Sequence, residues 1–325
     1  MNIVFIGTSK FGLRCLEACT EMHELNVVGV VTAPRTFSIS YRLSGVTNVL
    51  HANVAAFARD QHIPVAMLAG TMSDPTLLDV VKVWQPDAFI VAGWYHMIPK
   101  TWRALAPAYG LHASLLPDYR GGAPLVWAMI NGETKTGISL FQMGDGVDSG
   151  PIAAQAEESI RNDDTIDTLY ARIEERGLAL LRDALPAMAN GTLTLRSQDE
   201  SKCRTLPQRS PEDGRIDWNQ DCVVIDRFIR AQTRPYPGAF STLNGNPIII
   251  WAAQPHSQFQ GAETGHVKQT DDTCYMIACG TGGIALSEVS YGQRKYTGLQ
   301  LTDLLGGGGQ RLGDLTICLK SSKPC

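Results

Sequence analysis

The strongest constraint on the fold is a regular alternation of short apolar runs with amphipathic stretches along roughly the first 190 residues. The run at 2–6 ends at Gly7, and the runs at 25–31 and 88–92 are equally apolar, which is typical of parallel strands buried on both faces. Apolar residues at helical spacing between the runs predict helices at 10–20, 49–61 and 77–84. This order predicts an α/β fold with a mostly parallel, Rossmann-like sheet covered by helices on both faces.

The first domain is expected to end near residue 191. Short strands are predicted after residue 100, followed by a long helix that Asp163 and Asp164 can cap and that Gly191 can terminate. We therefore assign 1–191 to this domain. The strands are expected at 109–112, 138–141 and 152–155, with a short helix at 125–130.

A second domain is expected after a polar segment. Residues 192–214 contain prolines and lack a sustained periodicity, which predicts a linker. A helix at 222–232 and a series of short β segments follow, so we assign 215–325 to a small, OB-like β-barrel domain. The glycine run at 306–309 and the tail that follows are expected to be flexible.

Composition and charge exclude several classes of protein. Hydrophobic residues make up 44% of the chain and charged residues 18%, as in ordinary globular proteins. No apolar run reaches the roughly 20 residues that span a bilayer, and no basic segment precedes the first strand. The eight cysteines form no CxxC pair, and the seven histidines do not cluster with them. We expect a cytoplasmic protein with free thiols and no metal site.

The first glycine-rich turn does not predict a nicotinamide site. It runs from Gly7 to Gly12 and has Ser9 where a dinucleotide fingerprint has its second glycine. The amides at the start of the following helix could still face a phosphate or carboxylate, so Thr8 and Lys10 are candidate substrate-binding residues. The alternative is a tight structural turn.

Two residues in the stretch 110–151 suggest acid–base chemistry. His112 ends a predicted strand, and Asp148 lies in a glycine-rich loop after another. Strand ends of one sheet could bring them together, and a histidine beside a carboxylate is a general base with its orienting partner. The alternatives are a partly buried structural histidine and an aspartate that serves the turn.

The same stretch resembles a known family. The segments 112–117, 119–121 and 148–150 are similar to the signature of the 10-formyltetrahydrofolate-dependent formyltransferases, and most similar to the sugar-nucleotide and methionyl-tRNA enzymes. The resemblance runs nearly end to end, because 7–8, 86–87, 211–218 and 234–240 match as well.

The resemblance implies a catalytic trio of Asn, His and Asp, in which this chain departs at one position. His112 and Asp148 match, whereas Gly110 occupies the Asn position. That Asn is thought to donate a hydrogen bond to the developing oxyanion, and losing one such donor costs about 10²–10³-fold in rate. A backbone N–H, Ser114 or His96 could replace the donor, or the protein is impaired.

The resemblance also implies 10-formyltetrahydrofolate as co-substrate. The pterin is expected between the loops 93–97 and 143–148, and Arg120 could bind a phosphate. The alternatives are core packing for the aromatic and methionine side chains and a loop-fixing ion pair for Arg120. The residues expected to contact the co-substrate are Trp94, Met97, Leu115, Gly146 and Val147.

Three functions follow from these observations. Residues 191–325 hold 14 basic and 13 acidic residues, and the segment 32–44 has only two arginines, which is too little positive charge for a tRNA-binding enzyme. We therefore favour an N-formyltransferase acting on an amino sugar carried by a nucleotide. Methionyl-tRNA formyltransferase is the first alternative, and a non-catalytic binding protein, motivated by Gly110, is the second. No membrane partner is expected, and a homodimer stays open.

Overall fold

The computed structural model describes residues 1–39, 42–260, 263–271 and 274–313. The chain divides into two compact units. The first comprises residues 1–125, 134–160 and 169–208, and the second comprises 126–133, 161–168 and the chain from 209 onward. Residues 192–208, inside the predicted linker, thus belong to the first unit. None of the helices in the described ranges is long and apolar enough to cross a membrane.

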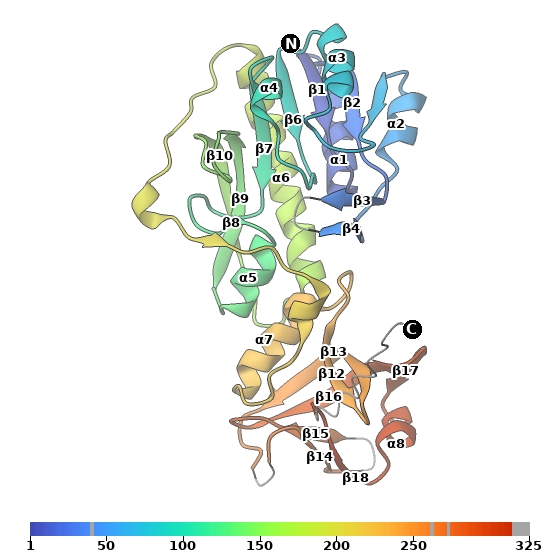
Figure 1. The fold of residues 1–325 in the computed structure, drawn as a ribbon. Helices are drawn as coiled ribbons and strands as arrows, with labels where there is room; N and C mark the ends of the chain where they lie inside the picture. The colour runs from blue at the N-terminus through green and yellow to red at the C-terminus, as the bar shows by residue number, and fades with distance from the viewer. Residues whose placement is uncertain (40–41, 261–262, 272–273, 314–325) are drawn as a thin grey trace, which may run out of the picture. The chain divides into compact units, whose positions relative to one another are not determined.

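The first unit is built on a seven-stranded sheet in the order β10-β9-β7-β6-β1-β2-β5 (Figure 1). The five strands from β7 to β5 are parallel neighbours, whereas β9 runs antiparallel to both β7 and β10. The predicted mostly parallel sheet is confirmed. The strands are β1 (Asn2–Ile6), β2 (Asn26–Thr32), β5 (Val65–Met67), β6 (Ala88–Val91), β7 (Ala108–His112), β9 (Lys135–Gln142) and β10 (Ile152–Ser159).

Helices cover both faces of this sheet, as predicted. Ile3 and Phe5 of β1 pack in one core cluster with residues of α1, α2 and α6, while Val4 and Ile6 pack in another with residues of α3 and α4. Alternation along a strand explains this division, because successive side chains point to opposite faces. The helices that cover the sheet are α1 (Lys10–Thr20), α2 (Val54–Asp60), α3 (Pro75–Val83), α4 (Lys100–Arg103) and α6 (Ile166–Ala189). Helix α5 (Pro124–Ile130) lies mostly in the second unit.

Several short elements were not predicted. A hairpin of β3 (Thr36–Ile39) and β4 (Arg42–Thr47) follows β2. The predicted helix at 49–61 begins only at Val54, because Asn53 caps it by accepting a hydrogen bond from the Ala56 amide. Strand β8 (Arg120–Gly121) pairs in parallel with β11 (Thr205–Leu206), which lies in the predicted linker.

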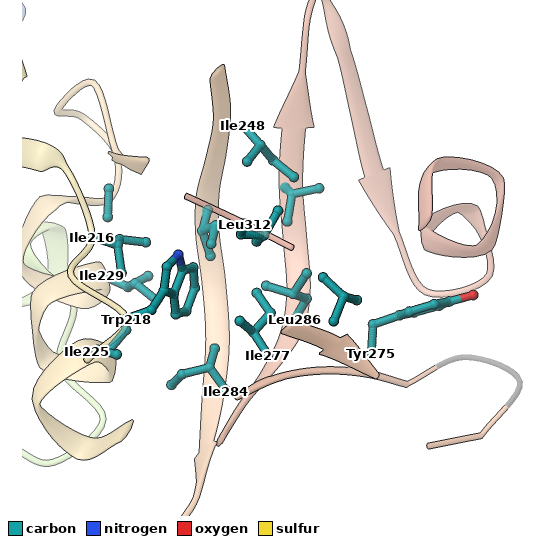
Figure 2. Packing of buried hydrophobic residues seen from close by; sticks show 14 of the residues in the cluster. Ile216, Trp218, Ile225, Ile229, Ile248, Tyr275, Ile277, Ile284, Leu286 and Leu312 are labelled. Carbon is teal, nitrogen blue, oxygen red and sulfur yellow. The ribbon is translucent and has the colours of Figure 1, made fainter. Parts of the chain in front are cut away.

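The second unit contains α7 (Cys222–Gln232) and a curled, antiparallel half-barrel sheet. Its core gathers Ile225 and Ile229 of α7 around Trp218 and the isoleucines of the sheet (Figure 2). The Trp218 indole donates a hydrogen bond of 2.9 Å to Ser241 Oγ. The remaining elements are β12 (Ala239–Leu243), β13 (Asn246–His256), β14 (His266–Gln269), β15 (Tyr275–Ala278), β16 (Gly283–Tyr291), β17 (Arg294–Thr297), α8 (Gln300–Leu305) and β18 (Gly308–Arg311).

The glycine run at 306–309, predicted to be flexible, enters a strand at Gly308. Gly308 to Arg311 form β18, which pairs with β14. Gly308 and Gly309 have φ values of 84° and 89°, so glycine here permits an unusual strand backbone. The predicted flexible tail at 314–325 lies outside the described residues.

One packing contact leads to a stability prediction. Gly29 is buried in β2, and a Cβ at this position would overlap with the indole ring of Trp84. We expect Gly29→Ala to lower the free energy of unfolding by about 1–3 kcal/mol, because the added methyl group overpacks the core. Urea denaturation measures this free energy. Gly70→Ala is the matched control, because a Cβ there meets nothing within 4 Å. Equal stabilities of the two variants would contradict the packing argument.

Candidate active site

The structure brings His112 and Asp148 together. His112 ends β7, and Asp148 lies in the loop that joins β9 to β10. The His112 Nδ1 and Asp148 Oδ2 atoms are 3.5 Å apart, and the two side chains are 11% and 22% exposed. Since β9 runs antiparallel to β7 and Gln142 pairs with Tyr109, this loop starts beside the beginning of β7 and returns to reach His112.

The carboxylate of Asp148 is held from the neighbouring loop. Its Oδ2 accepts a hydrogen bond of 2.9 Å from the Gly121 amide. Asp148 itself has a φ of 47°, in the left-handed region that non-glycine residues seldom adopt. The loop therefore adopts a costly backbone conformation at the residue whose carboxylate meets His112.

A main-chain carbonyl fixes the other side of the imidazole. His112 Nε2 lies 2.7 Å from the carbonyl oxygen of Tyr119. Because a carbonyl can only accept, Nε2 carries the proton of this hydrogen bond, and Nδ1 is the nitrogen that faces Asp148. Sequence reasoning did not identify Tyr119, although it lies within the motif, because a pattern of side chains does not specify which carbonyl a ring will meet.

Gly110 has the backbone of an ordinary strand residue. It pairs with Val91 of β6 and Phe141 of β9, and it is buried. A Cβ at this position would overlap with the Cε methyl of Met143. Met143 thus occupies the space that an asparagine would need, but a thioether has no hydrogen-bond donor to replace the amide.

The loop after β6 contains two polar atoms without partners. Within the described residues, Trp94 Nε1 and His96 Nε2 are buried and have no hydrogen-bond partner. The centroids of these two rings are 5.4 Å apart, and the centroid of the Phe37 ring lies 5.1 Å from that of His96. Burial lowers the pKa of His96, which favours the neutral ring. Buried polar atoms without partners are rare and suit a site that receives a polar ligand.

The apolar residues predicted to flank the co-substrate differ in exposure. Met97 and Val147 are 58% and 47% exposed, so core packing does not account for Met97. Trp94 packs partly against the core cluster that contains Val4 and Ile6. Leu115 is half-buried and Gly146 is exposed.

Three other candidates have structural partners. The Ser114 hydroxyl donates to the Asp118 carbonyl at 2.7 Å, which commits its proton and argues against Ser114 as the replacement donor. Thr8 is buried and donates to the Ala33 carbonyl at 2.9 Å, whereas Lys10 is exposed at the start of α1. Arg120 is 5% exposed, and its guanidinium binds Glu200 and Gln198, as in the ion-pair alternative.

Two family models match the chain. Residues 1–185 match the model described as formyl transferase, and residues 209–302 match the formyl transferase C-terminal domain. The chain belongs to the formyl transferase family. The resemblance found in the sequence is confirmed. No cluster of three His, Cys, Asp or Glu side chains that could hold a metal ion occurs in the described part of this formyl transferase.

Several solved structures share this fold. HypX from Aquifex aeolicus, in complex with tetrahydrofolic acid, is 18% identical with a TM-score of 0.63 over 94% of this chain and 47% of HypX, so the chain spans about half of HypX. An N-formyltransferase from Helicobacter canadensis, in complex with folinic acid and dTDP-3-aminofucose, is 18% identical with a TM-score of 0.65 over 90% of this chain and 99% of that chain. Methionyl-tRNA formyltransferase from Clostridium thermocellum is 19% identical with a TM-score of 0.53 over 81% of this chain and 97% of that chain.

Proposed function

We propose that this formyl transferase moves a formyl group from 10-formyltetrahydrofolate to the amine of an amino sugar carried on a nucleotide. The observation that carries the proposal is the approach of His112 Nδ1 to within 3.5 Å of Asp148 Oδ2 in a chain of this family. A neutral imidazole beside a carboxylate is suited to removing a proton from a nitrogen nucleophile.

His112 and Asp148 divide the proton transfer between them. The amine attacks the formyl carbon, a new C–N bond forms, and the amine nitrogen must then lose a proton. His112 accepts this proton at Nδ1, since Nε2 is engaged with the Tyr119 carbonyl, and Asp148 stabilises the resulting imidazolium. His112 returns the proton to the tetrahydrofolate nitrogen as the old C–N bond breaks, so atoms and charge balance.

The loops around the pair fit the co-substrate. A pterin is a flat ring with a polar edge, and two buried nitrogen atoms in the described chain, the donor Trp94 Nε1 and the ring nitrogen His96 Nε2, have no hydrogen-bond partner. Met97 and Val147 offer exposed apolar surface on the two loops predicted to flank it. The HypX and Helicobacter canadensis structures contain tetrahydrofolic acid and folinic acid respectively, which supports a folate co-substrate here.

The charge distribution favours a sugar nucleotide over tRNA. Binding an RNA backbone requires many basic residues, and residues 191–325 hold 14 basic against 13 acidic residues. Arg35 and Arg42 are the only basic residues in the segment 32–44. The Helicobacter canadensis enzyme was crystallised with dTDP-3-aminofucose, which supports the same substrate class. The similarity to methionyl-tRNA formyltransferase keeps Met-tRNA as the second candidate.

A panel assay tests the proposal. The purified protein is mixed with 10-formyltetrahydrofolate and one amine at a time, and the release of tetrahydrofolate is followed. We expect turnover with a nucleotide-linked amino sugar and none with Met-tRNA. Turnover with Met-tRNA alone would establish the second candidate, and no turnover with any amine would favour the non-catalytic binding role that Gly110 suggests.

Binding measurements give an independent prediction. At about 0.15 M salt we expect the protein to bind 10-formyltetrahydrofolate and to bind tRNA only weakly, with an affinity that falls steeply as salt is raised. Calorimetry for the folate and a filter-binding titration for tRNA measure the two affinities. Specific, submicromolar binding of initiator tRNA would reverse our ranking of the substrates.

A further inference from the structure

We infer that residues 196–206, which the sequence assigns to a linker, form a strap that positions the His112–Asp148 pair, with Gln198 as the positioning residue. The inference rests on the proposed function, because it takes His112 and Asp148 as the reacting pair. All the contacts that carry it lie within the first unit.

Gln198 holds the main chain around Asp148. Its Nε2 donates to the carbonyl oxygen of Asp148 at 2.7 Å and to that of Gly150 at 2.6 Å. These two hydrogen bonds hold the main chain of the loop at Asp148 and at Gly150. The hydrogen bond from the Gly121 amide to Asp148 Oδ2 holds the side chain. Both the main chain and the carboxylate of Asp148 are therefore held in place.

Arg120 determines how Gln198 is oriented. The Arg120 guanidinium donates from Nε and Nη2 to Gln198 Oε1 at 3.1 and 2.7 Å. Because a guanidinium can only donate, Oε1 must face Arg120 and the amide nitrogen must face the Asp148 loop. Glu200, which is exposed, binds the same buried guanidinium at 2.7 and 2.9 Å and completes a directional cluster.

The far end of the strap secures the His112 side of the pair. The Arg120 amide donates to the Arg204 carbonyl at 2.9 Å, as part of the β8–β11 pairing. The Arg204 guanidinium forms an ion pair with Asp118 and lies 4.4 Å from the centre of the Tyr119 ring. The Tyr119 carbonyl accepts the proton of His112 Nε2, so one short segment contacts the supports of both members of the pair.

The decisive substitution is Gln198→Glu. The new carboxylate keeps the length of the side chain and an acceptor for Arg120, but it has no proton to donate to the Asp148 and Gly150 carbonyls. We expect kcat to fall about 10- to 100-fold, the penalty for a catalytic group displaced by about 1 Å, with KM for both substrates within about twofold. Gln198→Ala removes the same donor and should give a similar fall in kcat.

The matched control is Asp199→Ala on the same strap. Asp199 is an exposed residue, and its side chain accepts hydrogen bonds from Ser201 and forms an ion pair with Lys202, both of which lie on the strap itself. It alters the strap without touching the Asp148 loop, so its kcat should stay within about twofold of the wild type. The melting temperature of each variant reports whether the fold is retained.

Hydrogen exchange at Gly121 provides a readout that does not depend on turnover. This amide donates to Asp148 Oδ2. Losing a hydrogen bond to a charged group should speed its exchange at least about tenfold in Gln198→Glu, as in Asp148→Ala. The exchange of the Leu140 amide in β9, a strand paired on both sides, should be unchanged, which separates a local displacement from a general loss of stability.

The outcomes separate the two proposals. If the wild type turns over no amine, the proposed function fails, and the Gly121 exchange alone decides whether the strap positions Asp148. The inference is overturned if Gln198→Glu and Gln198→Ala retain wild-type kcat. It is also overturned if Gly121 exchanges at the wild-type rate in Gln198→Glu.

Discussion

Replacing His112 with alanine is expected to lower kcat by about 10²–10⁴-fold, because the variant loses the group that takes the proton from the amine in the proposed reaction. Steady-state release of tetrahydrofolate, followed with the best amine of the panel, measures the effect. The melting temperature reports whether the fold is retained, since the His112 side chain also bonds the Tyr119 carbonyl. A variant that retains more than about a tenth of the wild-type kcat would refute the role of His112 as the base.

Asp148→Asn tests the second member of the pair by removing its charge and keeping its shape. The amide side chain keeps an oxygen that can accept from the Gly121 amide, so the loop should stay in place. The charge that stabilises the imidazolium is lost. A large fall in kcat with an unchanged exchange rate at Gly121 would assign the contribution of Asp148 to its charge. A fall in kcat together with faster exchange at Gly121 would assign it to the position of the loop.

Substituting Gly110 with asparagine is expected to lower the rate, by about 10- to 100-fold, although it restores the residue of the family trio. Its Cβ would overlap with Met143 Cε, and Met143 belongs to the loop that carries Asp148. Met143 Cε is the far end of a flexible side chain, so the methionine must take another rotamer beside the larger asparagine, and a shift of the loop by about 1 Å would be enough to cause such a loss. Measurements of kcat and of the free energy of unfolding together show whether the loss is confined to the site.

Gly110→Ala is the control for this prediction, because it introduces the same Cβ without an amide. If the site has been rebuilt around Met143, both substitutions should lower the rate to a similar degree. If the chain has simply lost an oxyanion donor, asparagine should raise the rate, by up to about 10²–10³-fold, while alanine lowers it. The double variant Gly110→Asn with Met143→Ala provides space for the amide and tests the second case without the overlap.

The sequence was sufficient to predict the sheet and the pairing of His112 with Asp148, but the argument from strand ends explains only part of this pairing. The apolar runs identify buried strands, and residues that follow strands tend to gather at one edge of a parallel sheet. Strand β9 is antiparallel to β7, however, so its end lies beside Tyr109 rather than beside His112. Asp148 reaches His112 only because the loop folds back, and no periodicity in a glycine-rich segment indicates that path.

The rest of the site depends on contacts that residue patterns do not encode. Met143 fills the space beside Gly110, and the Tyr119 carbonyl meets His112, through backbone paths with positive φ at Tyr119 and Asp148. Gln198 lies in a polar segment without hydrophobic periodicity, which is why we interpreted it as a linker. Hydrogen bonds between side chains and carbonyls leave no spacing in the sequence, so only the structure reveals them.

The pairing of β8 with β11 has a consequence for the exchange of domains between related proteins. A chimaera joined at residue 191, where the sequence places the end of the catalytic domain, would bring residues 196–206 from the other parent. Arg120 would then face a foreign residue in place of Gln198. A junction after Gln208, where the first unit ends, keeps the native segment with its own loops. Libraries of hybrid formyl transferases should therefore retain more active members when the crossover follows Gln208.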